Sequence, residues 1–200
     1  MNFLAHIFLS GTASEQLLIG NFIGDFVRGK QLQTYSPEVQ AGVRLHRAID
    51  SYTDHHPLVK QSAQRLKADY GKYAPVIVDV YYDHFLATHW HQYHPQQSLA
   101  QFAQSRYAIF QKHQALLPER VQYLLPYMIS QDWLLNYQQL SAIDRALCRL
   151  AERATFDSGL ERAIHNLEAE YSAFEQDFLT FFPDVQCFVS EQIALRAVVQ

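Results

Sequence analysis

Residues 45–57 (LHRAIDSYTDHHP) hold five side chains that can bind a metal ion or transfer a proton: His46, Asp50, Asp54, His55 and His56. The first three follow one another at intervals of four, so a helix would place them on one face. Imidazole and carboxylate groups in this arrangement suit a divalent cation such as Mn²⁺, Mg²⁺ or Zn²⁺. The alternative is a solvated helix face whose acids pair with Arg44 and Arg47, and this segment alone favours neither interpretation.

A second group of such side chains lies in residues 73–90 (YAPVIVDVYYDHFLATHW). Asp79 and Asp83 are four residues apart, and His84 follows directly. Asp83 stands among aromatic and aliphatic residues, where burying a carboxylate is costly unless it is paired or bound to a metal. A hydrogen bond to a tyrosine hydroxyl or an arginine would meet that need. The presence of two acid and imidazole groups in one chain favours metal ligation instead.

Two isolated residues have similar surroundings. Asp25 lies in GNFIGDFVRG, and His6 lies in FLAHIF. A lone histidine on an apolar face is usually a hydrogen-bonded core residue, so His6 is the weakest candidate. The chain has no GxSxG, GxGxxG or Walker loop, and neither cysteine adjoins a histidine. Acids and imidazoles on several helices therefore predict metal-assisted hydrolysis, in which the metal activates water and neutralises a phosphoryl group.

The sequence pattern places these groups on helices. Ser36-Pro37-Glu38 supplies an N-cap, a first-position proline and an acid, and predicts a helix that carries His46 and Asp50 and ends before Pro57. Residues 73–90 are almost continuously apolar and have no partner strand nearby, which predicts a buried helix. Ser14 can cap a helix over 16–27, where Gly20 and Gly24 allow close packing. The other predicted helices are 2–9, 57–70, 98–116, 119–130, 131–139, 141–153, 158–181 (ended by Pro183) and a last one to 197.

Composition supports an all-α protein. The chain has 200 residues, of which 48% are hydrophobic, and only seven glycines and seven prolines. No linker or repeat divides it, so we expect one compact helical domain over 1–200. Cys148 and Cys187 stand outside any CxxC spacing, and the start MNFLAHIFLSG lacks the basic region of a signal peptide. No apolar run is long enough to span a bilayer. We therefore expect a cytoplasmic protein without membrane or nucleic-acid partners.

Charge is distributed unevenly along the chain. The formal net charge is −4, but residues 28–72 contain eight of the 16 Lys and Arg and only four of the 20 Asp and Glu. This basic segment surrounds the first candidate group. It predicts an anionic substrate or partner, the alternative being chance variation in surface charge.

Four segments in this order resemble the acyl carrier protein phosphodiesterases: MNFLAHIFLS, GNFIGDFVRG, LHRAIDSYTDHHP and VDVYYDHFLATHW. The likeness continues through Asp132-Trp133 to FFPDV and covers essentially the whole chain. It implies hydrolysis of the phosphodiester that joins 4′-phosphopantetheine to a serine of holo acyl carrier protein, which leaves the apo protein. It also implies an all-helical, divergent HD phosphohydrolase that depends on Mn²⁺, with Mg²⁺ or another divalent cation possible. Asp83-His84 reverses the usual His-Asp order of that group.

The resemblance and the residue patterns together give a predicted site. The predicted metal ligands are Asp25, His46, Asp50, Asp83 and His84. Asp54 and His6 are predicted to transfer protons or to position the ligands. Arg28, Arg44 and Arg47 are predicted to meet the phosphate or the acidic carrier protein.

Two other functions remain open at this point. An HD-type phosphohydrolase acting on a nucleotide or another small phosphodiester would need no protein partner. A non-catalytic helical binding module would use the acids and histidines only for structure. Equal activity on a generic phosphodiester would favour the first, and the absence of both metal and hydrolysis would favour the second.

Overall fold

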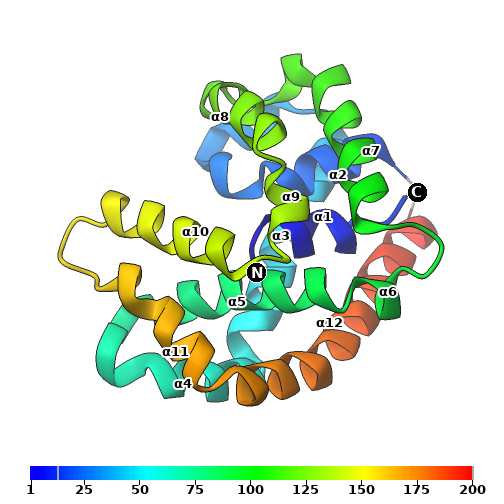
Figure 1. The fold of residues 1–200 in the computed structure, drawn as a ribbon. Coiled ribbons are helices and arrows are strands. Elements are labelled where there is room, and N and C mark those ends of the chain that lie inside the picture. Colours follow the sequence, from blue (N-terminus) through cyan, green and yellow to red (C-terminus); the bar gives the residue numbers. More distant parts are fainter. Residues whose placement is uncertain (13, 200) are drawn as a thin grey trace.

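The structure is a computed structural model that describes residues 1–12 and 14–199, with side chains described to residue 196. Over these residues it is a single compact bundle of helices without a strand, as predicted (Figure 1). The α-helices are α1 Phe3–Leu9, α2 Glu15–Phe22, α3 Pro37–His55, α4 Pro57–Tyr70, α5 Ala74–Thr88, α6 Trp90–Tyr93, α7 Leu99–Lys112, α8 Glu119–Ser130, α9 Trp133–Asn136, α10 Leu140–Arg153, α11 Ala163–Ala169 and α12 Tyr171–Val199. Short 3₁₀ helices are η1 Gly24–Phe26, η2 Gly29–Thr34, η3 Gly71–Tyr73, η4 Gln114–Leu116 and η5 Leu160–Arg162.

The helix starts follow the capping residues in the sequence. The Ser36 hydroxyl accepts a hydrogen bond from the Val39 amide, and Pro37 occupies the first turn of α3. Ser14 caps α2 in the same way through the Leu17 amide. The helices α3 and α4 meet at Pro57, where the His56 side chain accepts a hydrogen bond from the Leu58 amide. These caps fix the ends of the helices that carry the candidate site.

Two glycines bring α2 and α3 into direct backbone contact. A Cβ atom on Gly20 would lie 2.1 Å from the Val39 carbonyl oxygen, and one on Gly42 would lie 2.1 Å from that of Leu17. Only glycine allows this approach, which confirms the predicted role of Gly20 in close packing. As a result, the side chains on the adjoining turns of α2 and α3 can reach one another.

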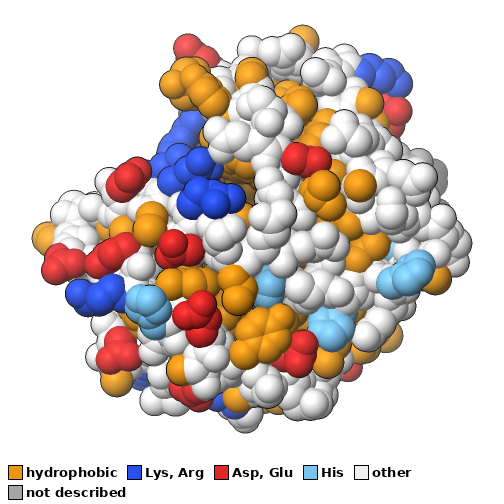
Figure 2. Space-filling model, in the orientation of Figure 1, with side chains coloured by type: hydrophobic (Ala, Val, Ile, Leu, Met, Phe, Trp, Pro, Cys, Tyr) orange, Lys and Arg blue, Asp and Glu red, His pale blue; other side chains and the backbone are white. Residues whose placement is uncertain are grey.

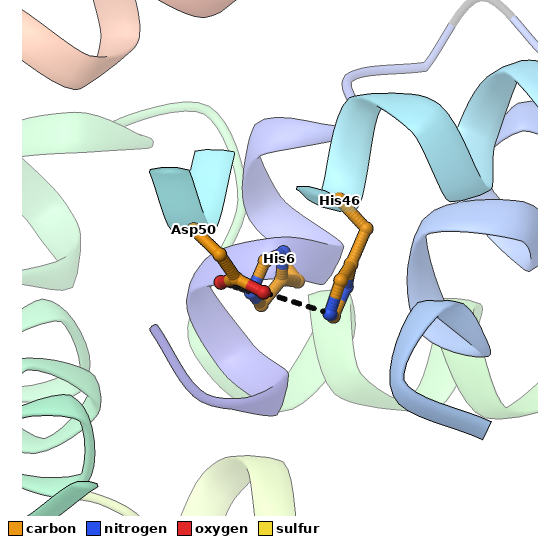
Figure 3. A group of neighbouring side chains, drawn as sticks. All are labelled: His6, His46 and Asp50. Atoms are coloured by element: carbon orange, nitrogen blue, oxygen red, sulfur yellow. Dashed lines mark hydrogen bonds and ion pairs between the residues drawn. The ribbon is translucent and has the colours of Figure 1, made fainter. Parts of the chain in front are cut away.

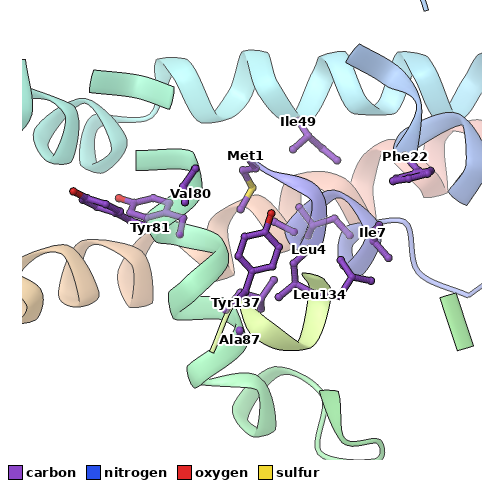
Figure 4. Close-up of a cluster of buried hydrophobic side chains, with 14 of the residues drawn as sticks. Met1, Leu4, Ile7, Phe22, Ile49, Val80, Tyr81, Ala87, Leu134 and Tyr137 are labelled. Atoms are coloured by element: carbon purple, nitrogen blue, oxygen red, sulfur yellow. The ribbon is translucent and has the colours of Figure 1, made fainter. Parts of the chain in front are cut away.

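The core surrounds α1 and α5. Helix α5 is the predicted buried helix: Val80, Tyr81 and the rest of its central turns are almost completely inaccessible to solvent. Figure 4 shows Leu4 and Ile7 of α1 among Ile49 and Tyr137, which belong to distant parts of the chain. Burial of so much apolar surface is the main stabilising contribution to the fold. It also holds the short helix α1, which would not be stable alone.

Several predicted helix boundaries are wrong, and the helix predicted over 98–116 ends at Lys112, before the separate turn η4. Helix α2 ends at Phe22, and residues 24–26 form the separate turn η1 rather than continuing to Val27. The predicted helix over 131–139 is reduced to the four residues of α9. The predicted helix over 158–181 is interrupted between α11 and α12, whereas α12 continues through Pro183. Buried Phe181, Phe182 and Val185 flank that proline, so packing outweighs its tendency to end a helix.

No helix in the described part of the chain combines the length and the apolar character needed to cross a membrane.

Candidate metal and active site

His6, His46 and Asp50 converge from α1 and α3, although 40 residues or more separate His6 from the other two (Figure 3). One ligand atom from each lies within 4.8 Å of the other two. The imidazole rings of His6 and His46 stack with their centroids 3.9 Å apart. Asp50 bridges them, with Oδ1 3.0 Å from His6 Nε2 and Oδ2 3.1 Å from His46 Nε2. The spacing of His46 and Asp50 on one helix face is therefore confirmed.

Asp25 adds a fourth group from η1. Its Oδ1 lies 3.2 Å from His46 Nε2, and its side chain is 73% exposed. The glycine before it explains the fit, because a Cβ atom on Gly24 would lie 2.2 Å from Cγ of His46. The absence of a side chain at residue 24 thus lets η1 pass directly over the imidazole. Together the four residues offer two nitrogen and two oxygen ligands.

Asn21 of α2 orients both imidazoles. Its side-chain nitrogen donates to the His6 carbonyl oxygen and to Ser10 Oγ, at 2.9 and 2.8 Å, so its side-chain oxygen must face His6. That oxygen lies 3.0 Å from His6 Nδ1, and the Asn21 backbone carbonyl lies 2.8 Å from His46 Nδ1. Both Nδ1 atoms must therefore donate, which leaves both Nε2 atoms free to bind a metal. Asn21 was not predictable from the sequence, because an asparagine in an apolar helix has no distinctive spacing.

Burial and the neighbouring carboxylates give the two histidines opposite properties. Burial lowers the pKa of His6 to about 4 despite its hydrogen bond to Asp50, so His6 is neutral near pH 7. For His46, Asp25 and Asp50 outweigh burial and raise the pKa to about 9. The pKa values of the Asp25 and Asp50 carboxyl groups are lowered, although burial opposes the shift. The cluster thus strongly favours positive charge beside its carboxylates.

The donor set fits a divalent cation. With Nδ1 of His6 donating to Asn21, Nε2 faces an oxygen of Asp50 at 3.0 Å, and this pair can share either a proton or a metal ion. His46 Nε2 is buried and makes no hydrogen bond of acceptable geometry among the described residues, despite the two nearby carboxylates. Two imidazoles and two carboxylates suit Mn²⁺, Zn²⁺ or a similar ion. These residues can therefore hold the kind of ion that the sequence predicts.

A positive charge from the start of the chain lies beside this cluster. The buried amino group of Met1 is 3.4 Å from Asp50 Oδ1 and 3.1 Å from Asp79 Oδ1. Burial would lower the pKa of this amine, but Asp79 and Asp50 raise it to about 10. The amine is therefore charged and joins α3 to α5 across the start of α1.

Asp83 and His84 do not lie in the cluster. The Asp83 carboxylate accepts hydrogen bonds from the Leu4 and Ala5 amides, at 2.7 and 3.1 Å, and so caps the first turn of α1. The His84 nitrogens lie 2.8 Å from the Tyr137 carbonyl oxygen and 3.0 Å from the Tyr171 hydroxyl. Asp83 thus positions the helix that carries His6, and the structure does not bring His84 to the predicted ion.

The remaining predicted residues lie around the cluster. Asp54 is exposed one turn beyond Asp50, and its charge contributes to the raised pKa of Asp79 after the larger effect of burial. Arg47 donates to the Val27 carbonyl oxygen at 2.9 Å and so supports the loop that follows η1. Arg44 contacts Gln40 on the exposed face of α3, and Arg28 is exposed at the start of η2. None of these three arginines contacts the cluster in the described structure.

Fold and site together define an all-helical protein with a cluster of two buried imidazoles and two partly exposed carboxylates. The family model for acyl carrier protein phosphodiesterase matches residues 1–185, and the chain belongs to this family. A relative from Yersinia pestis with that name is 40% identical over 183 residues, which cover 92% of this chain and 94% of the relative. One from Pectobacterium atrosepticum is 37% identical with the same coverage, and one from Escherichia coli O157:H7 is 34% identical over 96% of this chain and 99% of the relative. No solved structure matches the chain.

Proposed function

We propose that this protein hydrolyses the phosphodiester between 4′-phosphopantetheine and the serine of holo acyl carrier protein. The observation that carries the proposal is that four metal-binding groups converge within residues 1–185, the segment that matches the family. The relatives that match nearly the whole chain carry the name of the same activity. The products are the apo carrier protein and free 4′-phosphopantetheine, and we place the reaction in the cytoplasm.

We propose that His6, His46, Asp25 and Asp50 hold a divalent cation, Mn²⁺ or alternatively Mg²⁺. When bound, such an ion activates water and neutralises charge on the phosphoryl group. Asn21 fixes which nitrogen of each imidazole is available, as described above. The exposed side of Asp25 leaves an approach for a substrate that remains attached to a folded carrier protein. These residues thus bind the ion and orient its ligands, and none of them acts as a covalent nucleophile.

The test is to incubate the purified protein with holo carrier protein and Mn²⁺ and to follow the intact mass of the carrier. We expect loss of the prosthetic group, and we expect His46→Ala and Asp50→Ala to abolish it while retaining helical circular dichroism. Holo carrier protein that keeps its mass with Mn²⁺, Mg²⁺ and Zn²⁺ would overturn the proposed reaction. Undiminished hydrolysis after complete chelation of metal would overturn the metal assignment alone.

A further inference from the structure

A cavity of about 420 Å³ lies beside the cluster, between the start of the chain and helices α9 and α10. Its size is in the range of small-molecule binding sites. Asn2 and Phe3 line one side, Trp133 and Asn136 of α9 another, and α10 contributes a third. Figure 2 shows Lys and Arg side chains gathered beside a hollow on this face of the molecule. Neither α9 nor α10 contributes a residue to the site predicted from the sequence.

Three arginines of α10 line the cavity. Arg145, Arg149 and Arg153 recur every fourth residue, so they lie along one face of the helix over about 12 Å. None of them forms an ion pair with any carboxylate in the described part of the chain. Arg149 donates to Gln131 Oε1 at 2.9 Å, and its guanidinium lies 5.2 Å from the centre of the Trp133 ring. Three cations without acidic partners at one cavity wall favour an anionic ligand.

The cavity and the cluster are neighbours that share two lining residues. Asn2 and Phe3 line the cavity, and they also line the small pocket that contains His6, Asp25 and His46. A phosphodiester bound at the cluster therefore has one of its two ester branches next to the entrance of the cavity. The branch that ends in a serine belongs to a folded protein and is too large to enter. The other branch is a narrow, flexible chain that the cavity can hold.

On the basis of the proposed function, we infer that this cavity binds the phosphopantetheine half of the substrate. When the phosphate lies at the cavity entrance, the nearest guanidinium of α10 can bind its oxygens through paired hydrogen bonds, and the other arginines attract its charge along the wall, so the cavity favours the phosphorylated chain over the uncharged one. Trp133 and Leu150 offer apolar surface to the chain, and Asn2 and Asn136 offer amide groups to its peptide-like bonds. Arg145, Arg149 and Trp133 are thus specificity determinants for the prosthetic group.

The test is direct binding of 4′-phosphopantetheine to metal-free protein, measured by calorimetry. The absence of metal removes the contribution of the ion, so the cavity alone is examined. We expect Arg145→Ala with Arg149→Ala to weaken binding roughly tenfold or more, and Arg149→Lys to recover it only in part because lysine lacks the planar fork. Arg162→Ala is the matched control, because Arg162 is exposed, pairs with Glu161 and does not line the cavity.

Pantetheine without its phosphate should bind weakly to wild type and should not respond to the arginine substitutions. Equal binding of 4′-phosphopantetheine to wild type and the double variant would overturn the inference. So would variants that weaken the binding of apo carrier protein while binding 4′-phosphopantetheine normally, because the arginines would then dock the protein. Cleavage of holo carrier protein by wild type in either case would show that the proposed function stands without this cavity.

Discussion

At the residue scale, the cluster depends on groups that position its imidazoles and are not themselves among its four ligands. Asn21 fixes both imidazoles through one side-chain oxygen and one backbone oxygen. Gly24 provides the space that the ring of His46 occupies. The sequence predicted the pairing of His46 with Asp50, because four-residue spacing on a helix fixes it. It did not predict the partnership of His6 with Asp50, because 44 residues separate them and only the packing of α1 brings them together.

Gly24→Ala tests this arrangement. The added methyl group would meet His46 at Cγ and Cβ, which cannot move as the end of a flexible side chain could. We expect His46 to shift from Asp25 and Asp50, metal affinity to fall, and turnover to drop roughly tenfold to a hundredfold. The measurements are Mn²⁺ binding and hydrolysis of holo carrier protein, with thermal unfolding as the control for the fold. Unchanged metal affinity would contradict the role given to this glycine.

At the element scale, α1 is held in place by α5. This seven-residue helix is too short to be stable alone, and Asp83 satisfies two of its first amides. The sequence showed that Asp83 needed a partner but not which one, since the two amides lie 78 and 79 residues away. The boundary at Pro183 was missed for a related reason. Burial on both sides of the proline decides the outcome, and local propensity does not report burial.

Asp83→Ala should destabilise the fold by about 3 kcal/mol, because it leaves two buried amides without acceptors. If Asp83 were only a metal ligand, Asp83→Ala would instead lose activity and keep its stability. Chemical denaturation measures the free energy of unfolding. Asp157→Ala, at an exposed acid, is the control and should change it little. An Asp83→Ala protein as stable as the control would return Asp83 to the candidate ligands.

Asp83 should also make stability depend on pH. Burial raises its pKa to about 7, against the opposing effect of the Leu4 and Ala5 amides, from an ordinary value of 3.8. The folded protein therefore binds more protons than the unfolded chain between these values. The contribution of the Asp83 carboxyl group to the stability of the fold is complete below about pH 4 and is lost as the pH rises through 7. The thermal unfolding temperature of wild type should fall over this pH interval more steeply than that of Asp83→Asn. Parallel profiles would show that Asp83 is not responsible for the pH dependence.

At the scale of the whole molecule, the basic segment 28–72 is where we expect an acidic protein substrate to dock. The basic segment 28–72 supplies η2, α3 and α4, and Asp50, one of its four acids, belongs to the cluster. The excess of cations in the segment was readable from the sequence. The α10 arginines were equally visible, but nothing in their spacing showed that a cavity lies beside them. Local patterns give the face of a helix, whereas its neighbours depend on the complete fold.

Reversing charge in the basic segment should weaken docking of the carrier protein. Arg28→Glu with Lys60→Glu alters two exposed positions and leaves the cluster unchanged. We expect a higher KM for holo carrier protein and nearly unchanged hydrolysis of a small phosphodiester. Because salt screens such attraction, the wild-type KM for the carrier should also rise with ionic strength. A KM that does not respond to salt would exclude electrostatic docking whichever basic residues were chosen.

Asn2 and Phe3 adjoin both the cluster and the arginine-lined cavity, so occupation of one can affect the other through these two residues. A ligand that fixes the start of α1 from the cavity would also fix His6, which lies four residues after Asn2. The ion would then bind to a preorganised site. Thermodynamic reciprocity requires the ion to tighten binding of that ligand by the same factor. Titrating Mn²⁺ with and without 4′-phosphopantetheine, and the reverse, measures this factor twice. Such cooperativity would make the product hard to release while the metal stays bound, so departure of 4′-phosphopantetheine would limit turnover.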